Sequence, residues 1–276
     1  MFQISSRSGK SLDAIYSNGQ WRLLASRQSS PLARKAIRPF APANPVIPRT
    51  QWVTVSRPRV EVPILNQGQE ASCVGHGAST GQMLARSISG QTFQLLSPTF
   101  IYSLINGGLD NGADPADAAT ALTTKGVCLM SEFGEGEYLA SKIPTTAYAT
   151  AERFKALEIY SCANFDEVVS AFLLGFSVFD TIMVGARFNN LDSDGVPPVA
   201  FGPGNHCTAL GESLKQSRSG LWVVEHRNSW GTGWGFNGLF FQAEAHCTQQ
   251  GGNYEAYAIK SVADDPQDVT DLPVSS

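Results

Sequence analysis

LWVVEHRNSWGTGWGFNGLFF, residues 221–241, is the stretch that says most about the fold. Two apolar runs, rich in β-branched and aromatic residues, flank a segment that contains four glycines. Such runs, bounded by glycine and asparagine, are typical of short β-strands joined by tight connections. SVFDTIMVGARF (177–188) and HCTALGE (206–212) have the same character. We therefore expect the second half of the chain to be rich in β-strands.

The middle of the chain has a helical pattern instead. Each expected helix there has a start or stop signal, such as Ser97-Pro98 or Gly126. The segments are 80–89, 98–105 and 116–124. A further amphipathic helix is expected at 165–174, with Asn164 as its N-cap. A helical part followed by a strand-rich part predicts the α+β class, with a cleft between two lobes.

The N-terminal segment differs in charge from the rest. Residues 1–60 hold ten Lys and Arg residues and one acid, Asp13, whereas the remainder holds ten Lys and Arg against 23 acids. Seven prolines between residues 31 and 63 exclude a long helix and favour an extended strap. Asn18-Gly19, between two apolar runs, predicts a hairpin. We interpret residues 1–46 as a basic arm that is either solvated or docked on its own acidic domain, with a polyanion contact least favoured.

Composition and motifs exclude several classes of protein. The chain has 276 residues, 42% hydrophobic and 16% charged, which suits a globular protein. No run approaches the ~18 apolar residues of a membrane span, and the start lacks the apolar core of a secretory signal. We expect no membrane and no nucleic-acid partner, and a protein that is cytoplasmic or released without a general secretory signal. Residues 264–276 are predicted to be an acidic flexible tail.

Five cysteines form an odd set, so at least one thiol stays free. The disulfide state of the other four is left open: Cys128, Cys162, Cys207 and Cys247. Neither the cysteines nor the four histidines have metal-ligand spacing, and there is no glycine-rich phosphate loop. We expect no metal and no cofactor.

A cysteine with a distant histidine and asparagine is the minimum set for acyl transfer by a thiol. Cys73 lies in VPILNQGQEASCVGHGAST (62–80), and His206 opens an apolar run. Asn228 follows His206 by 22 positions. In this chemistry the thiolate attacks, the imidazole moves the proton and the amide fixes the ring. Core packing is the alternative for any single cysteine, but it does not explain the three blocks together.

At these residues the sequence resembles the papain-like cysteine peptidases. The family pattern NQG-x(4)-C is present at 66–73, and NSWG-x-x-WG-x-x-G at 228–238. The histidine block is Asn205-His206-Cys207. The resemblance covers about 47–263. It implies a papain-like two-lobe fold, with a mainly helical lobe at about 47–160, a β-barrel-like lobe at 161–263 and the active-site cleft between them.

The resemblance also implies roles for four residues. Cys73 would be the nucleophile and His206 its base, with Asn228 orienting the imidazole. Gln67 would donate its side-chain amide, with the Cys73 N–H, to the developing oxyanion. The thiol pKa would lie well below that of a free thiol, because His206 and the N-terminus of the helix that Cys73 opens both favour the thiolate.

Five more positions are expected to bind substrate or shape its site. Trp230 would shield the histidine–asparagine hydrogen bond from water. Asn111 and Gly112 resemble the family's stretch that pairs with the substrate backbone. Asn205 and Cys207 flank the catalytic histidine, and Cys207 would lie near the pocket for the side chain two positions before the cut. The neighbouring acids suggest that basic peptides, including the arm, are favoured: Asp110, Asp114 and Asp117.

The sequence departs from the family pattern close to the nucleophile. Glu70 stands where the family has a disulfide cysteine, and Val74 where it has a tryptophan, so the family disulfide is absent. Gly75, Gly77 and Gly81 each weaken the expected helix by ~1 kcal/mol relative to alanine. Close packing of the β lobe against this helix could explain them.

These observations predict a cysteine-type peptidase that hydrolyses peptide bonds in peptide or protein substrates through a thioester acyl-enzyme. Residues 1–46 would act as a short propeptide-like segment or as an intramolecular strap in the cleft. A catalytically silent relative that binds peptides or serves in assembly is one alternative. An acyl transferase that uses the same site is the other.

Overall fold

The computed structural model describes residues 1–58 and 61–263. Its strands form two sheets, one of three strands and one of seven. The small sheet consists of β1 (Phe2–Ser5), β2 (Ser11–Ser17) and β3 (Gln20–Leu23). The strands of the large sheet are β4 (Val55–Ser56), β5 (Ala156–Cys162), β6 (Ser177–Ile182), β7 (His206–Gln216), β8 (Trp222–Arg227), β9 (Leu239–Ala243) and β10 (Ala256–Val262).

Eight α-helices and two 3-10 turns complete the described part of the chain. The helices are α1 (Pro31–Ala36), α2 (Phe40–Ala43), α3 (Cys73–Ile88), α4 (Pro98–Ile105), α5 (Pro115–Thr124), α6 (Thr145–Glu152), α7 (Phe165–Leu173) and α8 (Glu244–Thr248). The 3-10 turns are η1 (Arg49–Gln51) and η2 (Ala140–Lys142). None of the described helices is long and apolar enough to cross a membrane.

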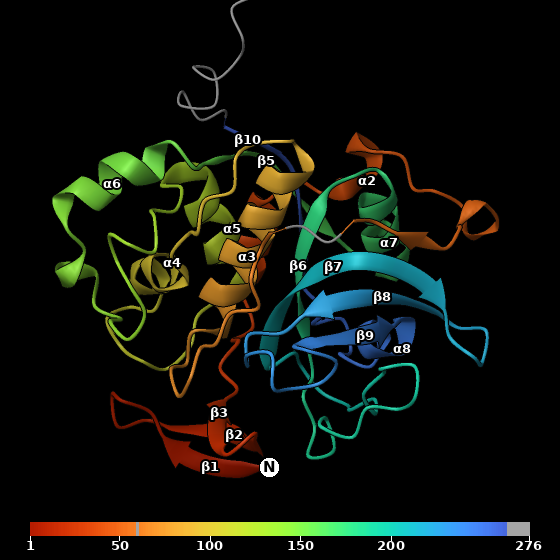
Figure 1. Ribbon diagram of the computed structural model, residues 1–276, viewed down its shortest axis with the longest axis horizontal. Helices are drawn as coiled ribbons and strands as arrows, with labels where there is room; N and C mark the ends of the chain where they lie inside the picture. Colours follow the sequence, from red (N-terminus) through yellow and green to blue (C-terminus); the bar gives the residue numbers. More distant parts are fainter. Residues whose placement is uncertain (59–60, 264–276) are drawn as a thin grey trace, which may run out of the picture.

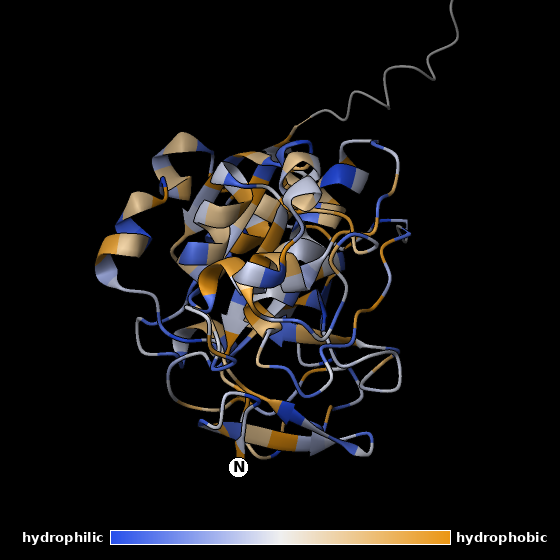
Figure 2. Cartoon of the chain, turned by 90° about the vertical axis from the view of Figure 1, so that its left-hand side faces the viewer, coloured by the Kyte–Doolittle hydropathy of each residue, from blue (hydrophilic) through white to orange (hydrophobic). Residues whose placement is uncertain are grey.

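The small sheet belongs to the basic arm and lies at one end of the molecule (Figures 1 and 2), where Ala14 and Leu23 pack into the core of the larger body. The predicted hairpin is confirmed, because β2 and β3 pair antiparallel on either side of Asn18-Gly19. Both turn residues have positive φ, 50° for Asn18 and 74° for Gly19. Asparagine and glycine tolerate this conformation best, and it matches the twist of a two-residue hairpin.

The large sheet forms the second lobe, with the order β5-β10-β6-β7-β8-β9 and β4 beside β7. Neighbouring strands pair antiparallel, and the sheet is open, with β5 and β9 at its edges. β7 curves strongly (Figure 1), so the barrel-like lobe takes the form of a curved open sheet. The strands β6 and β8 fall within the predicted segments, whereas β7 and β9 begin in them and extend past residues 212 and 241. β5 and β10 lie outside them, because a short apolar run does not by its period distinguish a strand from a buried helix.

The predicted helices are confirmed, and two of their caps are the predicted ones. Ser97 Oγ accepts a hydrogen bond from Phe100 N (3.0 Å) at the start of α4. Asn164 Oδ1 accepts one from Glu167 N (3.0 Å) at the start of α7. Each cap satisfies a backbone donor that the helix itself cannot.

α3 lies at the centre of the molecule (Figure 1), between α4 and α5 on one side and β6, β7 and β10 on the other. All of its residues from Cys73 to Arg86 are buried. A β-carbon at Gly77 would lie 2.8 Å from Cys207 Sγ, and one at Gly75 only 2.5 Å from Pro98 O. The expected packing of the β lobe is therefore present at Gly77, whereas Gly75 is packed against α4 of the helical lobe. Close packing outweighs the poor helix propensity of both glycines.

All five cysteines are buried and free, so the disulfides left open by the sequence are absent. The predicted boundary of the arm at residue 46 stays a prediction. The tail expected at 264–276 lies outside the described residues.

We expect Gly77→Ala to destabilise the protein by about 1–3 kcal/mol, because its methyl group would overlap Cys207 Sγ and contact the Thr208 backbone at 3.3 Å. Gly81→Ala is the matched control. Its β-carbon would meet nothing closer than 3.4 Å, so the gain in helix propensity should stabilise the protein by up to about 1 kcal/mol. Urea unfolding of both variants measures the difference, and equal effects would contradict the packing argument.

Candidate active site

Cys73 is the first residue of α3, and its side chain is fully buried. The thiol lies beside the backbone N–H of Cys207, the residue that follows His206, and beside the N–H of Ala25 in the arm. Burial raises the pKa of Cys73 to about 11, and these N–H groups offset the effect only in part. The nucleophile predicted from the sequence is thus next to the predicted histidine, but it is a neutral thiol near pH 7.

This protonation state corrects the expected low thiol pKa. The sequence suggested that His206 and the helix N-terminus would favour the thiolate. In the structure the thiol is sealed from water, and the loss of solvation of the charged form outweighs both influences. Burial likewise lowers the pKa of His206 to about 4. Thiol and imidazole are therefore both uncharged while the arm covers them.

His206 opens β7 and faces Asn228, which directly follows β8. Its Nε2 lies 2.8 Å from Asn228 Oδ1, and because that oxygen can only accept, Nε2 carries the hydrogen. The other ring nitrogen, Nδ1, is buried and has no hydrogen-bond partner among the described residues. The Trp230 ring covers the imidazole, with ring centroids 4.9 Å apart. The imidazole is thus held as a neutral base with its acceptor nitrogen unused.

Gln67 is held by Ser229, a residue that the sequence reasoning did not assign. Gln67 N donates to Ser229 O (2.8 Å), and Ser229 Oγ donates to Gln67 Oε1 (2.6 Å). The side-chain NH₂ then donates to Glu70 O (2.9 Å) and to Leu23 O of the arm (3.4 Å). Since Ser229 belongs to the NSWG block, its signal was present in the sequence.

A short part of the arm, residues 22–27, passes through the site, and we call it the inserted segment. Ser26 N donates to Asn205 O (3.0 Å), which places the predicted substrate-binding residue Asn205 against the arm backbone. Ala113 N donates to Ala25 O (3.2 Å), in a parallel bridge between Ser26 and Ala113. A β-carbon at Gly112 would lie 1.9 Å from Ala25 O, so only glycine allows the arm to approach this closely.

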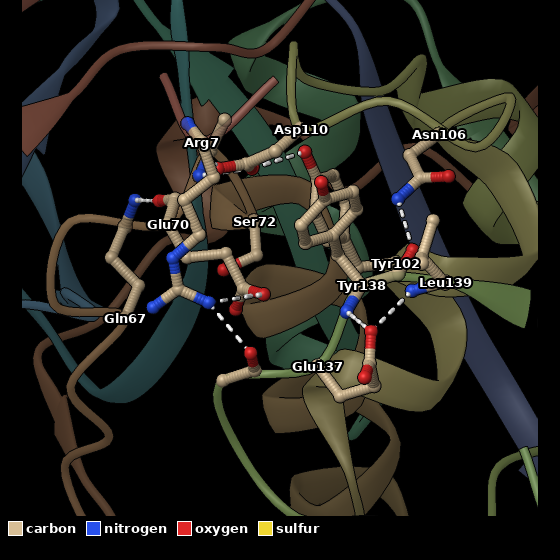
Figure 3. Close-up of polar contacts among 12 residues, drawn as sticks. Arg7, Gln67, Glu70, Ser72, Tyr102, Asn106, Asp110, Glu137, Tyr138 and Leu139 are labelled. Atoms are coloured by element: carbon tan, nitrogen blue, oxygen red, sulfur yellow. Dashed lines mark hydrogen bonds and ion pairs between the residues drawn. The ribbon is translucent and has the colours of Figure 1, made fainter. Parts of the chain in front are cut away.

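Gly112 is fixed by a buried polar network that the sequence did not predict (Figure 3). Gly112 N donates to the Tyr102 hydroxyl (3.2 Å), and that hydroxyl donates to Asp110 Oδ1 (2.8 Å). The same carboxylate oxygen accepts from Ala71 N (2.9 Å), two residues before the nucleophile. One carboxylate thus joins the nucleophile loop to the predicted substrate strand.

Glu70 lies beside this network, at the position where the family has its disulfide cysteine. Burial raises the pKa of its carboxyl to about 7. Arg7 of the arm approaches it, with Nη1 4.0 Å from Glu70 Oε1, and donates to Gly136 O (2.6 Å) (Figure 3). Arg7 N also donates to Asp110 Oδ2 (3.3 Å). The missing disulfide is therefore replaced by polar contacts that include the arm.

The remaining predicted residues lie close by, and their roles stay predictions. Asn111 precedes Gly112 and is buried, with Oδ1 unpartnered among the described residues. Cys207 points its sulfur at Gly77 of α3, so its side chain lies in the core and its amide faces Cys73. His226, which is not among them, directs its Nδ1 to Thr208 Oγ1 (3.0 Å) and Asp180 Oδ1 (3.3 Å), while its Nε2 is buried without a partner among the described residues. The described residues contain no cluster of acidic, cysteine and histidine side chains that could hold a metal ion.

Tyr102→Phe should weaken the substrate site without removing a catalytic group. It leaves Gly112 N and Asp110 Oδ1 short of a buried partner, a loss of about 1–3 kcal/mol. If the chain is a peptidase, KM should rise several-fold more than kcat falls, because the reacting groups are untouched. Tyr148→Phe, a partly exposed tyrosine, is the control. An unchanged KM would exclude this positioning role.

Because the Cys73 pKa is raised, its thiolate fraction at neutral pH is small and grows with pH. Iodoacetamide reacts with the thiolate, so alkylation of Cys73 in the full chain should be slower than that of a free thiol at pH 7 and should accelerate as the pH rises. Peptide mass spectrometry measures the rate at this residue. A rate that stays constant from pH 5 to 8 would indicate a thiolate–imidazolium pair instead.

No protein-family model matches the sequence, and no curated protein matches it significantly. Solved structures do match it. The region similar to xylellain, a cysteine protease from Xylella fastidiosa, spans 95% of this chain and 99% of the xylellain chain, with 19% identity and a TM-score of 0.64. Digestive procathepsin L 3 from the larval midgut of Tenebrio molitor covers 82% of this chain and 73% of its own, with 15% identity and a TM-score of 0.62.

The proform of the ragweed pollen allergen Amb a 11, a cysteine protease, covers 80% of this chain and 67% of its own, with 17% identity and a TM-score of 0.62. At such low identity the likeness concerns the fold. Helices on one side of α3 and an antiparallel sheet on the other agree with it. The chain therefore has the fold of the papain-like cysteine proteases.

Proposed function

We propose that this chain is a cysteine-type peptidase with Cys73 as nucleophile, His206 as base and Asn228 as the group that orients the imidazole. The observation that carries the proposal is the neutral His206 ring. Its Nε2 is fixed 2.8 Å from Asn228 Oδ1, its unused Nδ1 is buried, and the next residue, Cys207, directs its backbone N–H at the thiol. A base oriented through one nitrogen and free at the other is what thiol activation requires.

The reaction follows from these groups. The Cys73 proton passes to His206 Nδ1 while Sγ bonds to the carbonyl carbon of the scissile peptide. The oxygen becomes negative and accepts from Gln67 Nε2 and the Cys73 N–H. As the C–N bond breaks, the imidazolium gives its proton to the leaving amine, which departs with the pair of electrons. Water, deprotonated by His206, then cleaves the thioester and restores the thiol.

Neighbouring residues keep this machinery in place. Ser229 fixes the Gln67 amide so that Nε2, not Oε1, faces the oxyanion position, because the serine hydroxyl donates to Oε1. Trp230 covers the His206–Asn228 pair and excludes water from their hydrogen bond. Losing an oxyanion donor, as in Gln67→Ala, should lower kcat by about 10²–10³.

The arm acts as a restraint in this proposal. Leu23 O accepts a hydrogen bond from Gln67 Nε2, the donor that the oxyanion would need. Ser26 N and Ala25 O form backbone hydrogen bonds with Asn205 O and Ala113 N. The thiol meets the Ala25 N–H, a donor, rather than an exposed carbonyl carbon. The inserted segment thus fills the substrate site in a form that offers the nucleophile little to attack.

Ser26→Pro tests both the site and the restraint in the full chain. It removes the N–H that bonds to Asn205 O, so the inserted segment should dissociate more often and Cys73 should be alkylated about tenfold faster or more. Hydrolysis of a denatured protein should rise in parallel. Ser26→Ala is the matched control, since it keeps the N–H and removes only a hydroxyl without a partner among the described residues.

His206→Ala in the Ser26→Pro background should abolish both the fast alkylation and the hydrolysis. Fast alkylation without any peptide product would refute the peptidase and favour a silent peptide-binding relative. New amide products on addition of an amine would identify acyl transfer from the same thioester.

A further inference from the structure

Arg22 is buried, although it belongs to the arm and the two β3 residues before it, Gln20 and Trp21, are exposed and partly exposed. Its exposed fraction is 2%. Nη1 donates to Asn66 Oδ1 (2.6 Å) and Gly68 O (3.3 Å), and Nη2 donates to Trp230 O (3.2 Å). Three oxygens of the body thus converge on one guanidinium of the arm.

These oxygens belong to the frame of the candidate active site. Asn66 and Gly68 flank Gln67. Trp230 directly follows Ser229, whose hydroxyl orients the Gln67 side chain. The frame is held independently of the arm, because Asn66 and Trp230 form an antiparallel bridge and Gly231 N donates to Leu65 O (2.9 Å). Asn66 Oδ1 also accepts from Gly68 N (3.1 Å), which fixes its direction. The acceptors are therefore in place whether or not Arg22 is there.

The chemistry of the three acceptors favours a guanidinium over other groups. All three are uncharged oxygens, so they select a cation that loses its hydration easily rather than a strongly hydrated ammonium. They are reached by two different nitrogens, which a planar fork supplies and a single lysine nitrogen does not. Burial lowers the pKa of Arg22, yet an arginine stays charged in proteins.

The position of this pocket relative to Cys73 decides which part of a substrate would reach it. Arg22 precedes Leu23, whose carbonyl lies at Gln67, whereas Ala25 to Arg27 pair with the Gly112-Ala113 strand. The same part of the segment bonds to Asn205, close to Cys207, where the resemblance places the pocket for the side chain two positions before the cut. This end of the segment therefore corresponds to the acyl side of a substrate. The Arg22 pocket lies past the oxyanion donor, at the opposite end of the inserted segment.

We propose that Asn66 Oδ1, Gly68 O and Trp230 O form a substrate subsite for an arginine side chain on the leaving-group side of the scissile bond. This inference rests on the proposed peptidase function and adds the substrate class that it prefers. The arm closes the site by placing its own arginine in that subsite. A second arm arginine supports the view that the site favours basic chains, since Arg27 Nε donates to Asp114 Oδ1 (2.9 Å) at the other end.

The first test measures whether the pocket binds the arm through its guanidinium. Arg22→Ala and Arg22→Lys in the full chain should both alkylate at Cys73 faster than wild type, by about tenfold or more for alanine. Lys10→Ala removes an exposed charge from the same arm and should leave the rate unchanged. Equal rates in wild type and Arg22→Ala would overturn the proposal, whatever the fate of the peptidase function.

The second test measures substrate choice with the full-length Ser26→Pro protein. Peptides from a digested proteome, analysed by mass spectrometry after incubation, should show arginine enriched at the first or second position after the cut. Matched peptides with arginine, citrulline or lysine there should then differ in kcat/KM, with arginine at least about tenfold above citrulline, its uncharged isostere. Equal values for arginine and citrulline would overturn the inference.

Asn66→Ala separates recognition from general damage. It should reduce the arginine-to-citrulline ratio toward one, a change that a loss of folded protein would not produce. Alkylation of Cys73 that depends on His206, measured in the same sample, reports the proposed function separately. Normal His206-dependent alkylation and cleavage with an unchanged ratio would refute the subsite alone.

Discussion

The packing of α3 against β7 is the constraint on which the rest of the structure depends. Cys73, the proposed nucleophile, lies at the start of α3, and His206, its proposed base, lies at the start of β7. The distance between this helix and this strand therefore limits the distance between thiol and imidazole. Gly77 allows that distance, because any side chain there would meet Cys207 Sγ at 2.8 Å or closer. Glycine has a low helix propensity, but at this position it allows α3 and β7 to lie close together at the site.

The second determinant is exclusion of water. With the inserted segment in place, Cys73 and His206 are fully buried and both are uncharged, since burial raises the pKa of the thiol and lowers that of the imidazole. A charged pair needs solvation or compensating partners, and here the His206 Nδ1 has none among the described residues. In the proposed peptidase the arm would therefore act in two ways, by occupying the backbone partners of a substrate and by disfavouring the ion pair.

Polar contacts perform the structural role that the resemblance assigns to a disulfide. Asp110 connects Ala71 in the nucleophile loop with Tyr102, and Tyr102 holds Gly112. Arg7 of the arm also contacts Asp110 and Glu70. The arm therefore takes part in this polar connection, whereas it would take no part in a disulfide bond. The acids that suggested a preference for basic peptides thus divide into two sets. Asp110 is a buried structural carboxylate that accepts from Arg7 only a backbone N–H, whereas Asp114 pairs with the guanidinium of Arg27.

The sequence by itself determined the class of fold, the helices with strong caps, the Asn18-Gly19 hairpin and the set of Cys73, His206, Asn228 and Gln67. These follow from local rules: caps and turns depend on a few adjacent residues, and the blocks around the site have fixed spacing. The strands β5 and β10 and the open form of the sheet did not follow, since a short apolar run does not reveal its partner.

Only the tertiary structure decided the ionisation of the site and the path of the arm. A pKa depends on the water that surrounds a group, and the groups that exclude water from Cys73 come from residues far apart in the chain. The same holds for Tyr102, Asp110 and Arg22, whose side chains are ordinary in sequence. Their roles depend on the partners that folding brings to them. Tyr102 contacts Gly112, Asp110 contacts Ala71, and Arg22 contacts the three oxygens beside Gln67.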